Sequence, residues 1–127
     1  MRITLDSPGF EVKSENWYRA NRPTWMFAKQ RKAERNRTFF LWALSLEARR
    51  LRAEHGPFLV TLTRISKSAK GLDTDNLRGS FKRVRDAICE LLGIDDAKTD
   101  VIDFEYKQER GRGFGFRIEI DALNGLR

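Results

Sequence analysis

The fold is decided by residues 72–96, which read LDTDNLRGSFKRVRDAICELLGIDD. Apolar side chains recur there at the three- and four-residue spacing of an amphipathic helix, at Leu77, Phe81, Val84, Ile88, Leu91 and Leu92. We therefore predict a helix over about 75–92. Gly93 is a natural end for it, because glycine readily adopts the left-handed conformation that follows a helix C-terminus.

The sequence on either side of this helix predicts a small sheet and one more helix. Phe39, Ala43 and Leu46 form an apolar row within a predicted helix over Lys29–Glu54, which Gly56-Pro57 ends. Four segments carry the alternation or β-branched residues of strands: Arg2–Leu5, Phe58–Ile65, Val101–Lys107 and Phe114–Asp121.

The order β-α-β-α-β-β predicts an α/β fold, namely a small mixed β-sheet with two main helices in one domain over 1–127. Residues 6–28 form a basic arm that we expect to be irregular, and Arg110-Gly111-Arg112-Gly113 indicates a hairpin turn between the last two strands. No internal repeat or linker interrupts this pattern.

Composition narrows the class of partner. The 127 residues include 25 Lys and Arg against 18 Asp and Glu, which gives a net charge of +7 and favours a polyanion such as nucleic acid. A basic protein without such a partner is the alternative. A single cysteine precludes an intrachain disulfide, and no apolar run reaches membrane-spanning length, so we expect a cytoplasmic protein that does not enter membranes. The sequence contains no nucleotide-binding glycine-rich loop and no zinc-ligand spacing.

Acidic residues gather at both ends of the 75–92 helix. Asp73 and Asp75 precede it, and Asp95 and Asp96 follow it. In an extended run, Asp73 and Asp75 point to one side, and a compact sheet could return Asp95 and Asp96 to them. Carboxylate oxygens are the ligands that hard cations prefer, so we predict a Mg²⁺ or Mn²⁺ site. The alternative is structural, because Asp and Asn are good helix N-caps and Asp95-Asp96 suits a turn.

Basic residues supply candidate contacts to phosphates. Lys82 lies on the polar side of the helix, two turns beyond Asp75, where it would stabilise developing charge; pairing with Asp86 is the alternative. Gly79 lies between them and indicates either a close approach of a backbone or ligand, or a tolerated glycine. The candidate DNA-binding residues are Arg19, Arg22, Lys29, Arg31, Lys32, Arg35, Arg37 and Arg112.

The acidic pattern resembles a known family. Asp73-x-Asp75-Asn76-Leu77, a helix, Gly93-Ile94-Asp95-Asp96 and an alternating strand are similar to the RusA-type Holliday junction resolvases, which phages and prophages often carry. The similarity covers roughly residues 58–120. It implies a homodimeric, Mg²⁺-dependent endonuclease of recombination and repair that nicks four-way DNA junctions symmetrically.

The resemblance assigns metal binding to Asp73, Asp75 and Asp96, with Asp95 beside them and Asn76 in support. The family commonly places a lysine four residues after the second aspartate, where this chain has Gly79, and the nearest lysine is Lys82. Three rival functions remain open. One is a nuclease that acts on other branched DNA, the second is a DNA-binding protein on a catalytically degenerate scaffold, and the third is a small structural or assembly protein with no nucleic-acid role.

Overall fold

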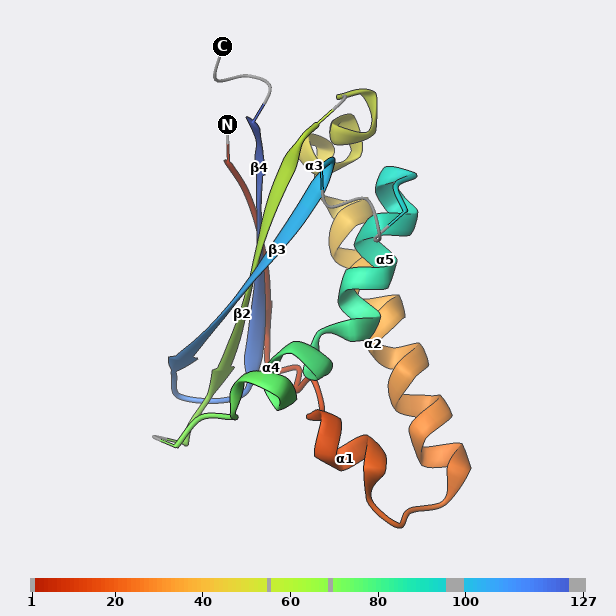
Figure 1. Cartoon of the computed structure of the whole chain (residues 1–127), viewed down its shortest axis with the longest axis vertical. Coiled ribbons are helices and arrows are strands. Elements are labelled where there is room, and N and C mark those ends of the chain that lie inside the picture. Colours follow the sequence, from red (N-terminus) through yellow and green to blue (C-terminus); the bar gives the residue numbers. More distant parts are fainter. Residues whose placement is uncertain (1, 55, 69, 96–99, 124–127) are drawn as a thin grey trace.

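The computed structural model describes residues 2–54, 56–68, 70–95 and 100–123. These residues form a four-stranded mixed sheet, and the helices gather on one of its faces (Figure 1). The strand order is β1-β4-β2-β3; β2 and β3 are parallel, and the other neighbours are antiparallel. The strands are β1 Arg2–Pro8, β2 Phe58–Ser66, β3 Ile102–Arg110 and β4 Gly115–Ala122. The predicted α/β class and element order are confirmed.

One face of the sheet holds the core. Ile3 and Leu5 of β1 are buried while their neighbours are exposed, and Phe116, Ile118 and Ile120 continue the same face across β4. These side chains form one hydrophobic cluster with the apolar stripe predicted for the central helix. Because strand side chains alternate between faces, the second face of the sheet stays largely polar.

Two helices rather than one connect the parallel strands β2 and β3. They are α4 Thr74–Ser80 and α5 Lys82–Leu92, so the single helix predicted over 75–92 is wrong at its centre. The break falls at Phe81 (φ −100°, ψ 7°), whose ring is fully buried 6.3 Å from the rings of Tyr106 and Phe116. Burial of this ring offsets the lost helical continuity. Gly93 ends α5 in the predicted left-handed conformation, with φ 70°.

The helix predicted over Lys29–Glu54 also divides. It begins earlier, as α2 Thr24–Leu44, and is followed by α3 Leu46–Arg50 and the short 3-10 helix η1 Leu51–Ala53. The break has a local cause, because the Ser45 hydroxyl accepts the Ala48 backbone N–H at 3.1 Å and caps a new helix. None of the helices in the described ranges is both long and apolar enough to cross a membrane.

The buried face of α2 is not the predicted apolar row. Its buried residues are Glu34, Thr38 and Trp42. Of the predicted row, Phe39 is half-buried, and Ala43 and Leu46 are exposed. Two of the three buried side chains are polar, so hydrophobic periodicity could not reveal this face. The arm over residues 6–28 is also more regular than expected: β1 extends to Pro8, and α1 Glu15–Arg19 forms a short helix.

The hairpin predicted at residues 110–113 is wrong, because β3 and β4 are not neighbours. Strand β2 lies between them, and the connection crosses the end of β2. Gly111 donates its N–H to the Ser66 carbonyl at 2.8 Å, and a Cβ on Gly111 would lie 2.6 Å from Cγ2 of Ile65. The glycine is needed for a close crossing rather than for a two-residue turn.

Candidate active site

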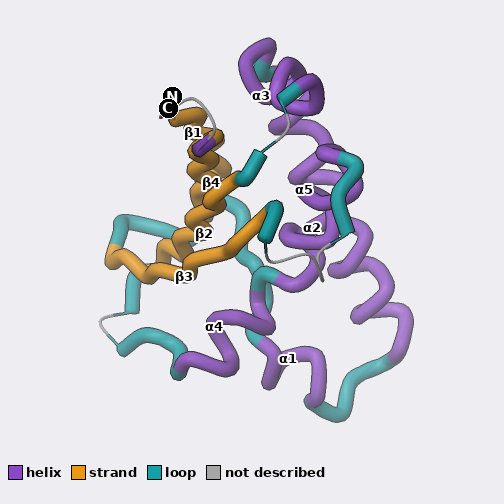
Figure 2. Tube along the Cα trace, turned by 45° about the horizontal axis from the view of Figure 1, so that its top comes forward, coloured by secondary structure: helices purple, strands orange, loops and turns teal. Residues whose placement is uncertain are grey.

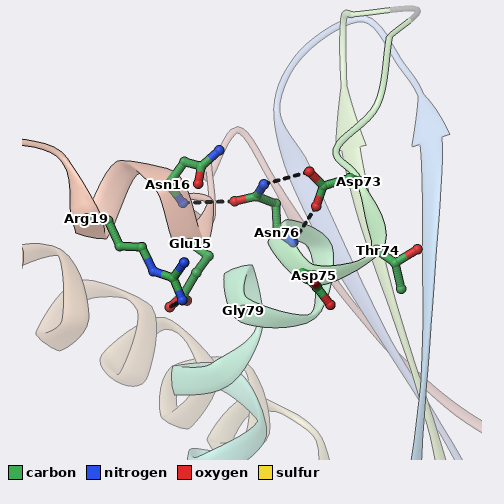
Figure 3. A pocket seen from close by; sticks show the side chains of 8 residues that line it. All are labelled: Glu15, Asn16, Arg19, Asp73, Thr74, Asp75, Asn76 and Gly79. Atoms are coloured by element: carbon green, nitrogen blue, oxygen red, sulfur yellow. Dashed lines mark hydrogen bonds and ion pairs between the residues drawn. The ribbon is translucent and has the colours of Figure 1, made fainter.

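Asp73 is the N-cap of α4. Its Oδ1 accepts the Asn76 backbone N–H at 2.9 Å, and its Oδ2 accepts the Asn76 side-chain N–H at 3.0 Å (Figure 3). These hydrogen bonds from Asn76 stabilise the ionised form and hold the pKa of the Asp73 carboxyl below its ordinary value. Asp73 is therefore held as a carboxylate in a fixed orientation by Asn76.

Asp75 lies in the first turn of α4 and is exposed. The expectation that Asp73 and Asp75 point to the same side is wrong, because residues 74–80 are helical and the two-residue period of a strand does not apply. Asp73 turns toward Asn76, whereas Asp75 turns away from it (Figure 3). Asp75 thus offers its oxygens to solvent at the positive end of a short helix.

A cavity of about 710 Å³ joins both aspartates to α1, and we call it the acidic cavity. Its lining residues are Glu15, Asn16, Arg19, Asp73, Thr74, Asp75, Asn76 and Gly79. Asn76 connects the two helices, because its Oδ1 accepts the Asn16 backbone N–H at 2.9 Å. The cavity therefore combines three carboxylates and one guanidinium, and no sulfur ligand is among its lining residues.

The structure adds Glu15 and Arg19 to the site, and Gly79 explains how. A Cβ on Gly79 would lie 2.7 Å from Cβ and 3.0 Å from Cδ of Glu15, so only glycine lets α1 lie this close to α4. Glu15 pairs with Arg19 at 3.4 Å on the same helix. Glu15 was not among the predicted site residues, and Arg19 was predicted only as a DNA contact. The available signal was a glycine inside an exposed helix.

The donors suit a hard divalent cation. Mg²⁺ usually keeps several waters and takes one or two protein carboxylates together with substrate phosphates. Asp73 and Asp75, with Glu15 opposite, provide such carboxylates, and Asp73 is already oriented. In the ranges that the structure describes, no three acidic, histidine or cysteine side chains lie close enough to hold an ion by themselves. This donor set could take only a hydrated ion that is held by one or two carboxylates and completed by a phosphate.

The remaining predicted ligands are not in this cavity. Asp95 follows the C-terminal end of α5, whereas Asp73 and Asp75 stand at the start of α4, and Asp95 does not line the acidic cavity. Figure 1 shows these two ends of the crossover well apart. The predicted return of Asp95 to the other aspartates is therefore not seen. Asp96 lies outside the described residues.

Lys82 is exposed at the first position of α5. It lines a second cavity of about 430 Å³, which also contains Glu15, Arg19, Arg31 and Asp86. Because Glu15 and Arg19 line both cavities, Lys82 lies next to the acidic cavity rather than inside it. The predicted alignment of Lys82 with Asp75 fails because the helix breaks between them. Arg19 is the cationic residue that lines the cavity of Asp75.

A buried carboxylate fixes the arm that carries α1. Glu34 of α2 is fully buried and forms an ion pair with Arg83 of α5 at 2.9 Å. It also accepts hydrogen bonds from the Lys13 backbone N–H and the Tyr18 hydroxyl at 3.1 Å, and from the Gln30 amide at 2.8 Å. Burial and the negative charge of Glu34 raise the pKa of Tyr18. We call these residues the Glu34 network.

Several of the predicted DNA-binding residues also make contacts within the chain, and all of them except Arg37 are exposed. Arg22 and Arg31 lie over the rings of Trp17 and Tyr18, Arg37 lies over Phe10, and Arg35 pairs with Glu90 at 2.8 Å. These four therefore also contribute to packing or surface pairing. The exposed members are Arg19, Arg22, Lys29, Arg31, Lys32, Arg35 and Arg112.

Figure 2 shows α1 beside α4, with α2 running on from the turn that follows α1. Arg31 of α2 lines the neighbouring cavity together with Glu15 and Arg19, so this basic residue lies near the acidic cavity. Neither the models of protein families nor the curated proteins compared with this chain match it. The resemblance to junction resolvases consequently rests on the sequence pattern alone.

Proposed function

We propose that this chain is a divalent-metal-dependent endodeoxyribonuclease that nicks branched DNA, foremost four-way junctions. The observation that carries the proposal is the acidic cavity, where an oriented Asp73, an exposed Asp75 and the Glu15–Arg19 pair meet in a chain of net charge +7. Carboxylates repel DNA unless a cation intervenes, so a basic protein that collects them at one cavity favours metal-assisted phosphate chemistry.

The residues divide the work as follows. Asp73 and Asp75 would hold Mg²⁺ or Mn²⁺, with Glu15 as the facing carboxylate. When bound, such an ion polarises the phosphodiester and lowers the pKa of a coordinated water. Asn76 keeps Asp73 ionised and immobile, and Arg19 presents a guanidinium that suits a nonbridging phosphate oxygen. Water attacks phosphorus in line and the 3′ oxygen leaves, so the products carry 5′-phosphate and 3′-hydroxyl ends.

Three further features belong to the proposal. The exposed cations Lys29, Arg31 and Lys32 at the start of α2 bind DNA arms through phosphates. Two opposed strands must be cut in a junction, so the active form is a homodimer with two equivalent sites. The protein acts in the cytoplasm, and it uses no nucleotide cofactor.

A DNA-binding protein without nuclease activity is the second candidate, and two observations favour it. Both carboxylate oxygens of Asp73 are already bonded to Asn76, and Gly79 stands where the resembled family commonly has a lysine. This candidate predicts junction binding that persists in EDTA and no nicks with any divalent cation.

The test is incubation of an end-labelled four-way junction, a fork and a linear duplex of shared sequence with Mg²⁺, Mn²⁺ or EDTA. Paired nicks in the junction that require metal are the expected result. Faster nicking of the fork would redirect the proposal to other branched DNA. Binding without nicks in either metal would overturn the nuclease and favour the second candidate.

A further inference from the structure

Another polar cavity lies where the parallel strands β2 and β3 end. The net charge of its lining residues is positive, whereas that of the acidic cavity is negative. We call it the basic cavity; it measures about 190 Å³ and is lined by Arg64, Ser66, Ser68, Gly71, Glu109 and Arg110, with Gln108 at its edge. Arg64 and Ser66 belong to β2, and Arg110 lies opposite Ser66 in the parallel register. None of these residues was predicted to bind DNA.

Arg64 is the unusual residue of this cavity. Its side chain is only 11% exposed, and its Nε is buried without a hydrogen-bond partner in the described chain. Within the described residues, its ion pair from Nη2 to Glu11 is long at 3.7 Å. Burial lowers the pKa of the Arg64 guanidinium, and Glu11 only partly opposes this effect. A buried guanidinium with so little compensation is costly unless an anion completes its surroundings.

The other charges around the cavity do not supply that anion. Glu109 lines the cavity, but its carboxylate already forms an ion pair with Arg117 at 3.1 Å. Glu11 is shared, since it also pairs with Lys13. Arg110 is exposed beside Arg64, and Lys67, Lys70 and Arg112 are exposed on the adjoining loops. The net charge of the side chains at this end of the sheet is therefore positive.

We propose that the basic cavity binds one backbone phosphate of the DNA through Arg64 and Arg110. Its place relative to the acidic cavity supports this ligand. Gly71 lines one cavity and Asp73 the other, and Gln108 holds Leu72 between them through both backbone groups, at 2.7 and 2.8 Å. Two residues of chain span at most about 7 Å, which matches the rise of about two base pairs along the helix axis and keeps both cavities within reach of one strand.

This inference rests on the proposed function for its ligand, but the anion site itself can be tested without DNA. The variant is Arg64→Met, which keeps much of the side-chain volume and removes one charge. The control is Arg49→Met, an exposed arginine on α3, at the opposite end of the molecule from the end of β2 (Figure 1). Arg110→Met is the second variant, because it is exposed and should fold normally if Arg64→Met does not.

The first readout is the melting temperature in inorganic phosphate compared with chloride at equal ionic strength. Phosphate should raise the melting temperature of the wild type and of Arg49→Met, and should raise that of Arg64→Met and Arg110→Met clearly less. Equal phosphate shifts in all four proteins would overturn the proposed anion site.

The second readout is junction binding in EDTA over a salt series. Arg64→Met should bind about tenfold more weakly than Arg49→Met, and its salt slope should fall by about one unit. Unchanged binding with a lost phosphate shift would show an anion site that DNA does not use and overturn the DNA ligand. A wild type that binds the junction without nicking it would contradict the proposed nuclease alone, because junction binding and the phosphate readout would still report the anion site.

Discussion

The Glu34 network and the acidic cavity use carboxylates in opposite ways, although both contact the same arm. Glu34 is fully buried, and the protein supplies its partners: Arg83, Tyr18, Gln30 and the Lys13 backbone. Asp75 is exposed in a cavity that other acids share. A carboxylate whose partners are internal serves the fold, whereas a group of carboxylates left open to solvent is available to a ligand.

Asp73 stands between these cases. It is exposed like Asp75, yet both of its oxygens are bonded to Asn76. The comparison therefore predicts that Glu34 mainly controls stability, Asp75 mainly controls chemistry, and Asp73 contributes to each. Four variants test this order.

The largest effect should come from the Glu34 network. Glu34→Ala leaves Arg83 nearly buried without its partner, and it should lower the free energy of unfolding by about 3–5 kcal/mol. Urea unfolding at neutral pH measures this loss. Glu90→Ala is the matched control, because Glu90 also joins α5 to α2 through an arginine, but at the surface. It should cost less than about 1 kcal/mol, and equal losses would contradict the assigned role.

Asp75→Asn should change the nicking rate rather than the stability. Removing an exposed acid from the acidic cavity should slow metal-dependent nicking on the order of 100-fold, and it should leave urea unfolding unchanged and junction binding intact or tighter. Single-turnover nicking measures the rate. Asp103→Asn, an exposed acid on β3, should nick as the wild type does. Equal nicking by both variants would remove Asp75 from the site.

Gly79→Ala tests the contact between α1 and α4. The new methyl group would displace Glu15, and a shift of about 1 Å at a reacting centre should slow nicking about tenfold or more. Gly113→Ala is the control, because a Cβ at Gly113 meets nothing within 4 Å. If Gly79→Ala nicks at the wild-type rate, Glu15 does not need its present position.

The smallest effect concerns pH. The folded pKa of Asp73 lies below its ordinary value of 3.8, so its ionised form stabilises the fold above that value, and the stabilisation is lost as pH falls through the folded pKa. Asp73→Asn should therefore be less stable than the wild type at pH 6, and the gap should narrow by pH 3. Urea unfolding at both pH values measures it. If the difference in free energy of unfolding between the two proteins is the same at both pH values, Asn76 does not stabilise the ionised form of Asp73.

The strongest periodicity of the chain predicted its structure well. Val84, Ile88 and Leu92 are apolar, buried and regularly spaced, and helix α5 follows them. The inner face of α2 could not be predicted, because Glu34 and Thr38 are polar and their burial depends on partners distant in sequence. The position of β2 between β3 and β4 could not be predicted either, because the glycine-rich connection that crosses β2 has the same sequence pattern as a hairpin turn.

The candidate site was predicted in part. Local patterns identified Asp73, Asp75 and Asn76, because capping and acidic clustering are visible over four residues. Glu15 was not found, since its approach to Gly79 joins residues 64 positions apart and depends on the Glu34 network. Residues that tertiary packing brings together have no characteristic spacing in the sequence, so their contact cannot be predicted from it.

The most direct test of the account asks where the cation binds. Fe²⁺ with ascorbate, added to the junction-bound protein, generates hydroxyl radicals that cut the polypeptide beside a bound ion, and the fragments locate the cuts. We predict cuts near Glu15–Arg19 and near Asp73–Gly79, both suppressed by excess Mg²⁺ and by Asp75→Asn. Cuts confined to other segments, or cuts that Asp75→Asn leaves unchanged, would contradict a metal site in the acidic cavity.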